Sequence, residues 1–276
     1  MLEVQLEYSK HKTTYNDIKY NIKHESRCNM KEVLKVKNIS KIYQAENGEV
    51  EAVRDVSFSV EEGEFVSLIG PSGCGKSTVL SIIAGLEEKT SGNIEIDGQI
   101  GYMLQKDSLL EWLTIYKNVL FGLEIKNIKT TENVKYVENL LKKYNLYEFK
   151  DKYPNQLSGG MRQRAALIRT LAIKPKILLL DEAFSALDYQ TRIMVTKDIY
   201  DILKNEHITA LIVTHDISEA ISMSDRVIVL SNRPAVVKEI HTIDFEMENR
   251  TPLNCRESPK FSKYFDTIWK GLNVHE

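Results

Sequence analysis

The feature of this chain that most limits its possible folds is a glycine-rich loop between an apolar strand and a helix. Residues 65–69 form the apolar stretch, residues 79–85 have a helical pattern, and the loop between them reads Gly-Pro-Ser-Gly-Cys-Gly-Lys-Ser-Thr. Glycines let backbone N–H groups turn toward an anion, and the positive end of the following helix points at the same place. This order of elements predicts an α/β P-loop fold that binds a nucleoside triphosphate.

The residue types in the loop each fit a part of that binding. Lys76 is expected to reach the β- and γ-phosphates, and the Ser77 hydroxyl is expected to bind Mg²⁺. The alternative is a flexible glycine-rich turn that matches the motif by chance. From ordinary residue frequencies, such a match is expected in about one of a hundred chains of this length. We therefore expect the whole loop to bind the nucleotide, which includes Gly70, Pro71, Ser72, Gly73, Cys74, Gly75, Lys76, Ser77 and Thr78.

Charge and composition exclude several classes of partner. The chain of 276 residues has 37 Lys and Arg against 39 Asp and Glu, so it lacks the basic excess that nucleic-acid binding requires. Its three cysteines have no paired or metal-ligand spacing, which fits a reducing cytoplasm. No apolar run approaches the roughly 18–20 residues of a membrane span. We expect neither a nucleic-acid partner nor a membrane-spanning segment.

Apolar spacing divides the chain into three segments. Residues 1–30 are polar and aperiodic and are expected to be an extension, with Met30 as an alternative start of translation. Residues 31–245 are expected to form the core domain. Within this domain, from about residue 106 to about residue 173, apolar residues recur at helical spacing and no clear strand is present, which predicts an inserted helical subdomain. Residues 246–276 are expected to form a tail with a short helix.

Strands and helices alternate again after the helical segment. The apolar runs at 176–180, 209–213 and 226–230 are nearly continuous, and a helix is expected at about 189–205 between the first two. Such runs are typical of parallel strands covered on both faces. Residues 33–60 have strand-like patterns, and residues 94–102 are expected to form an edge of a mixed sheet.

Two adjacent carboxylates follow the apolar run that ends at Leu180. In a nucleoside triphosphatase, Asp181 would hold Mg²⁺ and Glu182 would orient and deprotonate the attacking water. The alternative is an ordinary solvated strand end. In the loop before another helix, Ser158 is a plausible N-cap, and Gly159 and Gly160 allow close approach of an anion, although a capped helix alone explains them equally well.

Six sequence elements together resemble those of ATP-binding cassette (ABC) ATPases. They are residues 70–78, Gln105, residues 157–163, residues 180–182, residues 185–188 and His215, and they occur in the family's order. The likeness covers about residues 31–235. It implies a P-loop NTPase with a mixed central sheet, an antiparallel β subdomain and an inserted α-helical subdomain, and it implies ATP hydrolysis with ATP and Mg²⁺ bound.

The resemblance also implies roles for single residues. Tyr43 matches the aromatic side chain that stacks on adenine, although an ordinary strand-end tyrosine remains an alternative. Gln105 matches the glutamine that senses Mg²⁺ and the attacking water. His215 matches the histidine that contacts the γ-phosphate and steadies Glu182, and Asp188 matches an aspartate that contacts the opposite subunit.

The resemblance implies that Ser158 and Gly160 act on ATP held by a second copy of the chain, and Gly159 between them is also expected to belong to the nucleotide-binding residues. The resemblance therefore implies a head-to-tail dimer that holds two nucleotides between its subunits. ATP binding is expected to close the dimer, and hydrolysis is expected to reopen it.

Residues 105–114 and the tail at 257–261 are similar to the ATPases of bacterial importers for nitrate, sulfonate, taurine and bicarbonate, although Glu111 replaces a frequent proline. This implies a peripheral protein on the cytoplasmic face of the cell membrane, which acts with an integral permease and indirectly with a solute-binding protein. Leu109, Leu110 and Trp112 either form a groove wall for a permease helix or fill the core of the helical subdomain.

Two other classes of ABC protein compete with an importer. A soluble ATPase of translation or DNA repair is disfavoured, because the chain has one P-loop and Ser158 follows Lys76 too closely for a long coiled coil. A soluble ATPase of cluster assembly stays open. An exporter cassette has the same ATP chemistry, but the residues at 105–114 and the tail favour import.

Overall fold

Two separate β-sheets organise the part of the chain that this computed structural model describes, residues 31–45 and 48–273. The extension predicted for residues 1–30, with its alternative start at Met30, lies outside the described residues. The smaller sheet has the strand order β2-β1-β4, and β1 runs antiparallel to β4. Its strands are β1 (Glu32–Ala45), β2 (Gly48–Glu61) and β4 (Ser91–Ile96).

The larger sheet has six strands in the order β5-β6-β7-β3-β8-β9. The first five are parallel, and β9 runs antiparallel to β8. Every residue of β3 and of β7 is buried, as the continuous apolar runs predict. The strands are β3 (Phe65–Ile69), β5 (Ile100–Met103), β6 (Ile177–Asp181), β7 (Thr209–Val213), β8 (Arg226–Leu230) and β9 (Val237–Thr242).

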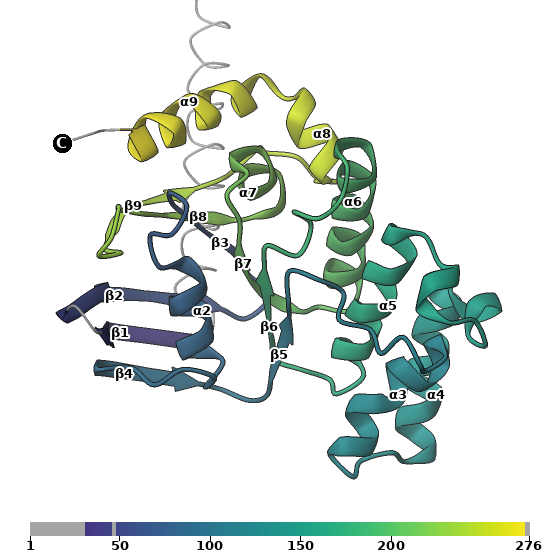
Figure 1. The fold of residues 1–276 in the computed structure, drawn as a ribbon. Helices are drawn as coiled ribbons and strands as arrows, with labels where there is room; N and C mark the ends of the chain where they lie inside the picture. Colours follow the sequence, from purple (N-terminus) through teal and green to yellow (C-terminus); the bar gives the residue numbers. More distant parts are fainter. Residues whose placement is uncertain (1–30, 46–47, 274–276) are drawn as a thin grey trace, which may run out of the picture. The chain divides into compact units, whose positions relative to one another are not determined.

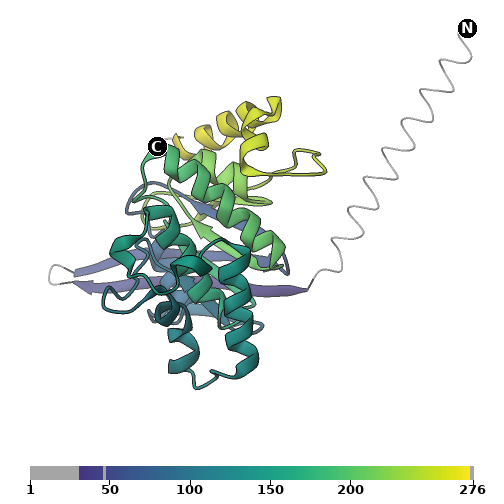
Figure 2. The same cartoon turned by 90° about the vertical axis from the view of Figure 1, so that its right-hand side faces the viewer.

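The helices form three groups around these sheets. Helix α2 (Lys76–Ile83) contacts both β2 of the small sheet and β6 and β7 of the large one (Figure 1). A helical segment lies to the right in that view and faces the viewer in Figure 2. It contains α3 (Ile115–Ile125), α4 (Thr131–Lys143), the 3₁₀ turns η1 (Tyr147–Phe149) and η2 (Pro154–Gln156), and α5 (Gly159–Leu171).

The remaining described helices follow strands of the large sheet or lie in the C-terminal tail. Helix α6 (Tyr189–Asn205) packs against α5, and α7 (Ile217–Met223) packs against β3. The tail contains α8 (Pro252–Glu257) and the amphipathic helix α9 (Pro259–Asn273), which contacts β8, β9 and α7 (Figure 1). Ile268 of α9 is fully buried, so apolar contacts anchor the tail to the core.

The strands expected at 65–69, 176–180, 209–213 and 226–230 and the helix expected at 189–205 lie within one residue of their predicted positions, whereas α2 begins three residues before the helical pattern at 79–85. Two further features differ. Residues 94–102 do not form one sheet edge, because β4 pairs with β1 and β5 pairs with β6 in the other sheet. Strand β9 is an addition that the sequence pattern did not indicate. The proposed division into residues 1–30, 31–245 and 246–276, with a helical subdomain at about 106–173, stays a prediction.

Candidate nucleotide-binding site

The P-loop and the residues predicted to act in ATP hydrolysis lie at one edge of the large sheet. The loop of residues 70–75 follows β3, Glu182 follows β6, His215 follows β7 and Gln105 follows β5. Because these strands are parallel and adjacent, their carboxyl ends meet at the same edge. The sheet topology therefore gathers residues that are far apart in the sequence.

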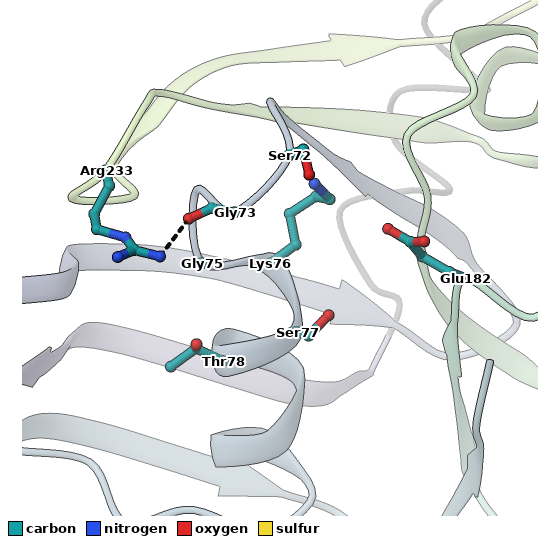
Figure 3. Close-up of a pocket in the computed structure, with 8 residues that line it drawn as sticks. All are labelled: Ser72, Gly73, Gly75, Lys76, Ser77, Thr78, Glu182 and Arg233. Atoms are coloured by element: carbon teal, nitrogen blue, oxygen red, sulfur yellow. Dashed lines mark hydrogen bonds between the residues drawn. The ribbon is translucent and has the colours of Figure 1, made fainter. Parts of the chain in front are cut away.

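A cavity of about 170 Å³ opens at this edge (Figure 3). Seven of its eight lining residues are among the predicted site residues, and the eighth is Arg233. They are Ser72, Gly73, Gly75, Lys76, Ser77, Thr78, Glu182 and Arg233. Figure 3 shows the loop and the start of α2 on one side of the cavity and Glu182 on the other.

The glycine-rich loop is held in a conformation that larger residues would not fit. Gly75 has φ of 126°, and a Cβ atom there would lie 2.7 Å from the carbonyl oxygen of Ala52. This close approach explains why the loop needs glycine at that position. Lys76 is only 5% exposed, and its Nζ donates to the carbonyl oxygens of Gly70 and Pro71 at 2.9 Å each. The ammonium group is thus kept inside the loop, where a phosphate would meet it.

Ser77 and Asp181, the predicted Mg²⁺ ligands, lie next to each other. The Ser77 hydroxyl donates to Asp181 Oδ1 at 3.0 Å, and the Tyr102 hydroxyl donates to Asp181 Oδ2 at 3.2 Å. Burial raises the pKa of the Asp181 carboxyl, and these two hydrogen bonds oppose the rise. A hydroxyl and a carboxylate are hard oxygen donors, which Mg²⁺ prefers, so this pair fits that ion. Gln105, the third predicted ligand, is not among the residues that line the cavity.

Glu182 and His215, the predicted catalytic pair, are in contact. His215 Nδ1 lies 3.3 Å from Glu182 Oε2, and the histidine side chain is about half exposed. Glu182 has φ of 45°, an uncommon value for a residue with a side chain, and its N–H donates to the Val213 carbonyl at 2.9 Å. The bond to β7 holds this backbone conformation, so the carboxylate is directed to the cavity (Figure 3).

Gln105 connects to the same region through Ser185. Its Nε2 donates to Ser185 Oγ at 3.0 Å, and that hydroxyl donates to the Glu182 carbonyl at 3.0 Å. Two hydrogen bonds therefore join Gln105 to the backbone of Glu182, the predicted catalytic glutamate. Gln105 is itself exposed.

The residues predicted to face a second subunit lie outside this cavity, at two helix N-termini. Ser158 caps α5, where its Oγ accepts from the Met161 N–H at 3.3 Å. Asp188 caps α6 and accepts from the Thr191 N–H at 3.0 Å, and these contacts lower the pKa of its carboxyl. Gly159 and Gly160 form the first turn of α5. None of the four lines the cavity described above.

Tyr43 lies on β1 and is partly buried against the core between the sheets. The Lys41 ammonium lies 4.7 Å from the centroid of the Tyr43 ring. Pro71 and Cys74 complete the loop without lining the cavity, and Gly70 is packed against Leu230 and the Cys74 sulfur. The Cys74 thiol is buried, which raises its pKa.

The apolar residues of the segment 109–112 were expected either to form a groove wall for a permease helix or to fill the core of the helical subdomain. The structure gives them different surroundings. Leu109 is 6% exposed and belongs to the core of the helical segment, whereas Trp112 is 73% exposed. Asn118, which is fully buried, holds this segment through hydrogen bonds to Leu110, Leu113 and Thr114. The segment is thus fixed in place while its tryptophan faces outward.

Three residues of this region were assigned no role from the sequence. Arg233 lines the cavity, Gln163 donates from α5 to the Ala183 carbonyl at 2.8 Å, and Asn118 anchors the Trp112 segment. Gln163 and Asn118 lie in helices. The sequence signal that could have identified them is a polar residue at a position where the helical pattern places a buried side chain. Arg233 had none, because its contact with the loop depends on the turn between β8 and β9.

Comparisons with known proteins show which family the chain resembles. A family model described as ABC transporter matches residues 53–185. An uncharacterized ABC transporter ATP-binding protein of Bacillus subtilis (strain 168), YtlC, is 47% identical over 251 residues, which are 88% of this chain and 96% of that protein. The nitrate import ATP-binding protein NrtD of Synechocystis sp. is 38% identical over 255 residues, again 88% of this chain and 96% of that protein.

Two more comparisons concern a transport relative and a solved structure. The aliphatic sulfonates import ATP-binding protein SsuB of Bacillus cereus is 38% identical over 229 residues, 79% of this chain and 86% of that protein. The dimeric post-hydrolysis structure of the ATP-binding cassette MJ0796, bound to ADP and Pi, superposes with a TM-score of 0.64 at 32% identity. It covers 76% of this chain and 99% of that one.

Proposed function

The chain belongs to the ATP-binding proteins of ABC transporters, and we propose that it powers import of a small oxyanion through separate membrane permease subunits. Family membership confirms the predicted fold class, ATP binding and ATPase activity. Among the described helices, none has the length and hydropathy needed to cross a bilayer. We place the protein at the cytoplasmic face of the membrane, held there by a permease.

The observation that carries the proposal is that the glycine-rich loop, the predicted Mg²⁺ ligands and the predicted catalytic pair meet at the carboxyl edge of the large sheet. Backbone N–H groups of the loop and the Lys76 ammonium would bind the phosphates. Ser77 and Asp181 would hold Mg²⁺, which supplies positive charge to the phosphate oxygens when it is bound. Glu182 would orient the attacking water and take its proton.

His215 would act by keeping Glu182 in position. The contact of 3.3 Å between His215 Nδ1 and Glu182 Oε2 supports this role, because the carboxylate must keep one orientation toward the water. Gln105 would be coupled to the backbone of Glu182 through Ser185, whose hydroxyl donates to the Glu182 carbonyl. On the nucleotide, Tyr43 would stack against adenine, since it is an aromatic residue on β1 that is only partly buried.

A second copy of the chain would complete the site. Ser158, Gly159, Gly160 and Asp188 lie at two helix N-termini outside their own cavity, with Ser158 and Asp188 exposed. Helix N-termini attract anions, so α5 of a partner copy is suited to the open side of a bound triphosphate. The dimeric state of the similar cassette MJ0796 supports a dimer of this chain, and the head-to-tail arrangement is our proposal.

The import of an oxyanion is supported by the named activities of relatives, which include nitrate and aliphatic sulfonates import proteins. The exposed Trp112, fixed through Asn118, is suited to contact the permease. A solute-binding protein outside the membrane would deliver the substrate to that permease. Substrate choice would be made by those two proteins, so this chain supplies energy rather than specificity.

The proposed cycle is tested with Glu182→Gln in the purified full chain. With ATP and Mg²⁺ the variant is expected to bind nucleotide, to lose hydrolysis and to accumulate as a dimer, measured by light scattering after size exclusion. Lys76→Ala serves as the control that does not dimerise, because it lacks the phosphate partner. A variant that hydrolyses ATP at the wild-type rate would remove Glu182 from its role.

The transport role needs a separate experiment. Affinity purification of the chain from detergent-solubilised membranes is expected to recover an integral permease, and oxyanion uptake into cells is expected to stop in the Glu182→Gln strain. Repeated recovery of the chain without any membrane protein would favour a soluble ABC ATPase instead.

A further inference from the structure

The turn after β8 places a cationic side chain at the nucleotide cavity. Arg233 lines the cavity, and its Nη2 donates to the Gly73 carbonyl of the P-loop at 2.8 Å (Figure 3). A guanidinium has five N–H donors in a fixed plane, so one bond to Gly73 leaves donors for another acceptor. Arg233 is an exposed residue at the cavity, where an incoming anion can reach it.

The turn that carries Arg233 is firmly attached to the protein on both sides of it. Ser231 Oγ donates to the Pro234 carbonyl at 2.9 Å and accepts from the Val236 N–H at 2.9 Å. Ala235 forms two backbone hydrogen bonds of 2.9 Å with β2, at Ala52 and Arg54. The base of the arginine side chain is therefore positioned by both sheets, and little ordering remains when its guanidinium binds a ligand.

The charges around the cavity favour binding of an anion at the end where Arg233 lies. Among its lining residues, Lys76 and Arg233 are basic and Glu182 is acidic. Burial raises the pKa of the nearby Cys74 thiol, and the positive charges of Lys76 and, to a smaller degree, Arg233 oppose that rise. Figure 3 shows Arg233 and Glu182 at opposite ends of the cavity, with Lys76 between them.

We propose that Arg233 is an additional nucleotide-binding residue that fixes the P-loop through Gly73 and binds the part of the nucleotide remote from Glu182. Arg233 has this role only if the cavity binds ATP, as proposed above. Since Glu182 would act at the bond that is hydrolysed, Arg233 would contact the portion that ATP and ADP share. Such an interaction is equal in the ground state and the transition state, so it strengthens binding without accelerating the chemical step.

The test compares Arg233→Ala with the wild-type chain for ATP and ADP. Removing a charge-assisted contact is expected to raise the Kd of both nucleotides about tenfold and by the same factor. The KM for ATP is expected to rise by that factor while kcat changes less than about twofold. Arg233→Lys keeps the charge without the planar fork and is expected to recover part of the affinity.

Two controls separate this role from others. Arg54→Ala removes an equal charge from an exposed residue of β2 that pairs with Glu51, and is expected to leave both Kd values unchanged. Lys76→Ala is expected to lose binding of both nucleotides. A wild-type chain that binds no ATP would overturn the proposed function itself. Wild-type Kd values in Arg233→Ala, or a loss confined to kcat or to ATP, would overturn the role of Arg233 alone.

Discussion

Replacing Asn118 by alanine should release the segment that carries Trp112. Asn118 is fully buried at the start of α3, and its side chain satisfies backbone groups of the preceding loop. Oδ1 accepts from the Leu110 N–H at 2.7 Å, and Nδ2 donates to carbonyl oxygens of residues 110, 113 and 114 at 3.0–3.1 Å. One side chain therefore fixes the loop of residues 110–114.

The size of the effect follows from the number of bonds. The amide has two hydrogens and one accepting oxygen in use, which makes three well-formed hydrogen bonds at about 1 kcal/mol each, so Asn118→Ala should lower the free energy of unfolding by about 3 kcal/mol. Asn133→Ala is the matched control. Its side chain donates one bond, to the Ile128 carbonyl at 2.8 Å, and its loss should cost about 1 kcal/mol.

Asn118→Asp separates hydrogen bonding from packing because it preserves the shape of the side chain. The aspartate would still accept from Leu110, but a carboxylate oxygen would face three carbonyl oxygens in a buried place. We therefore expect it to be at least as destabilising as alanine.

Urea unfolding measures the free energies of these variants, and Trp112 reports the loop itself. In a Trp269→Phe background, the fluorescence anisotropy of Trp112 should fall in Asn118→Ala and stay unchanged in Asn133→Ala. If Asn118→Ala and Asn133→Ala differ by less than about 1 kcal/mol and the anisotropy is the same in both, the loop is not held by Asn118 and the reasoning is wrong.

Three further changes test the site and its surroundings. Gly75→Ala should reduce ATP affinity more than about tenfold, since its Cβ would lie 2.7 Å from the Ala52 oxygen, whereas Gly85→Ala, with a φ of 72° and open space, should leave ATP titrations unchanged. Lys76→Ala should abolish ATP-dependent protection against thermal unfolding. Burial raises the pKa of Glu219 from 4.5 to about 8, so as the pH rises the unfolded chain loses this proton near pH 4.5 while the folded chain keeps it until about pH 8. The contribution to stability is therefore fully present below pH 4.5 and declines by about 1.4 kcal/mol per pH unit between these values, and urea unfolding of Glu219→Gln should lack this decline.

The sequence was most informative where one local pattern determines both an element and its place. The apolar run of β7 and the helix α6 have the limits expected, because a buried strand needs a continuous apolar stretch and Asp188 provides a cap. Once β3, β6 and β7 are parallel neighbours, the residues that follow them must meet at one edge. The P-loop and the Asp181–Glu182 pair were therefore predictable as one site.

Pairing between distant strands was not predictable from local patterns. Leu34 of β1 pairs with Ile96 of β4, and Gly101 of β5 pairs with Leu178 of β6. Each partner is far away along the chain, and the alternation within a strand specifies its faces but not its neighbour. Strand β9 was also not predictable from its local pattern. It is an edge strand whose residues, including Ile240, are exposed or partly exposed, so its sequence resembles that of a polar loop.

Helix α5, which Ser158 caps, connects the two ends of the proposed mechanism. Near its start, Gln163 bonds to the residue after Glu182, and further along it Arg169 donates to the carbonyl oxygens of residues 107 and 108 at 2.7–2.9 Å. Those residues lead into the segment that presents Trp112. A nucleotide held by the N-terminus of α5 across a dimer would thus act on one helix that contacts both the loop after Glu182 and the segment proposed to face the permease. Hydrolysis and transport can be linked by movement of α5 as one body, without any rearrangement of the large sheet.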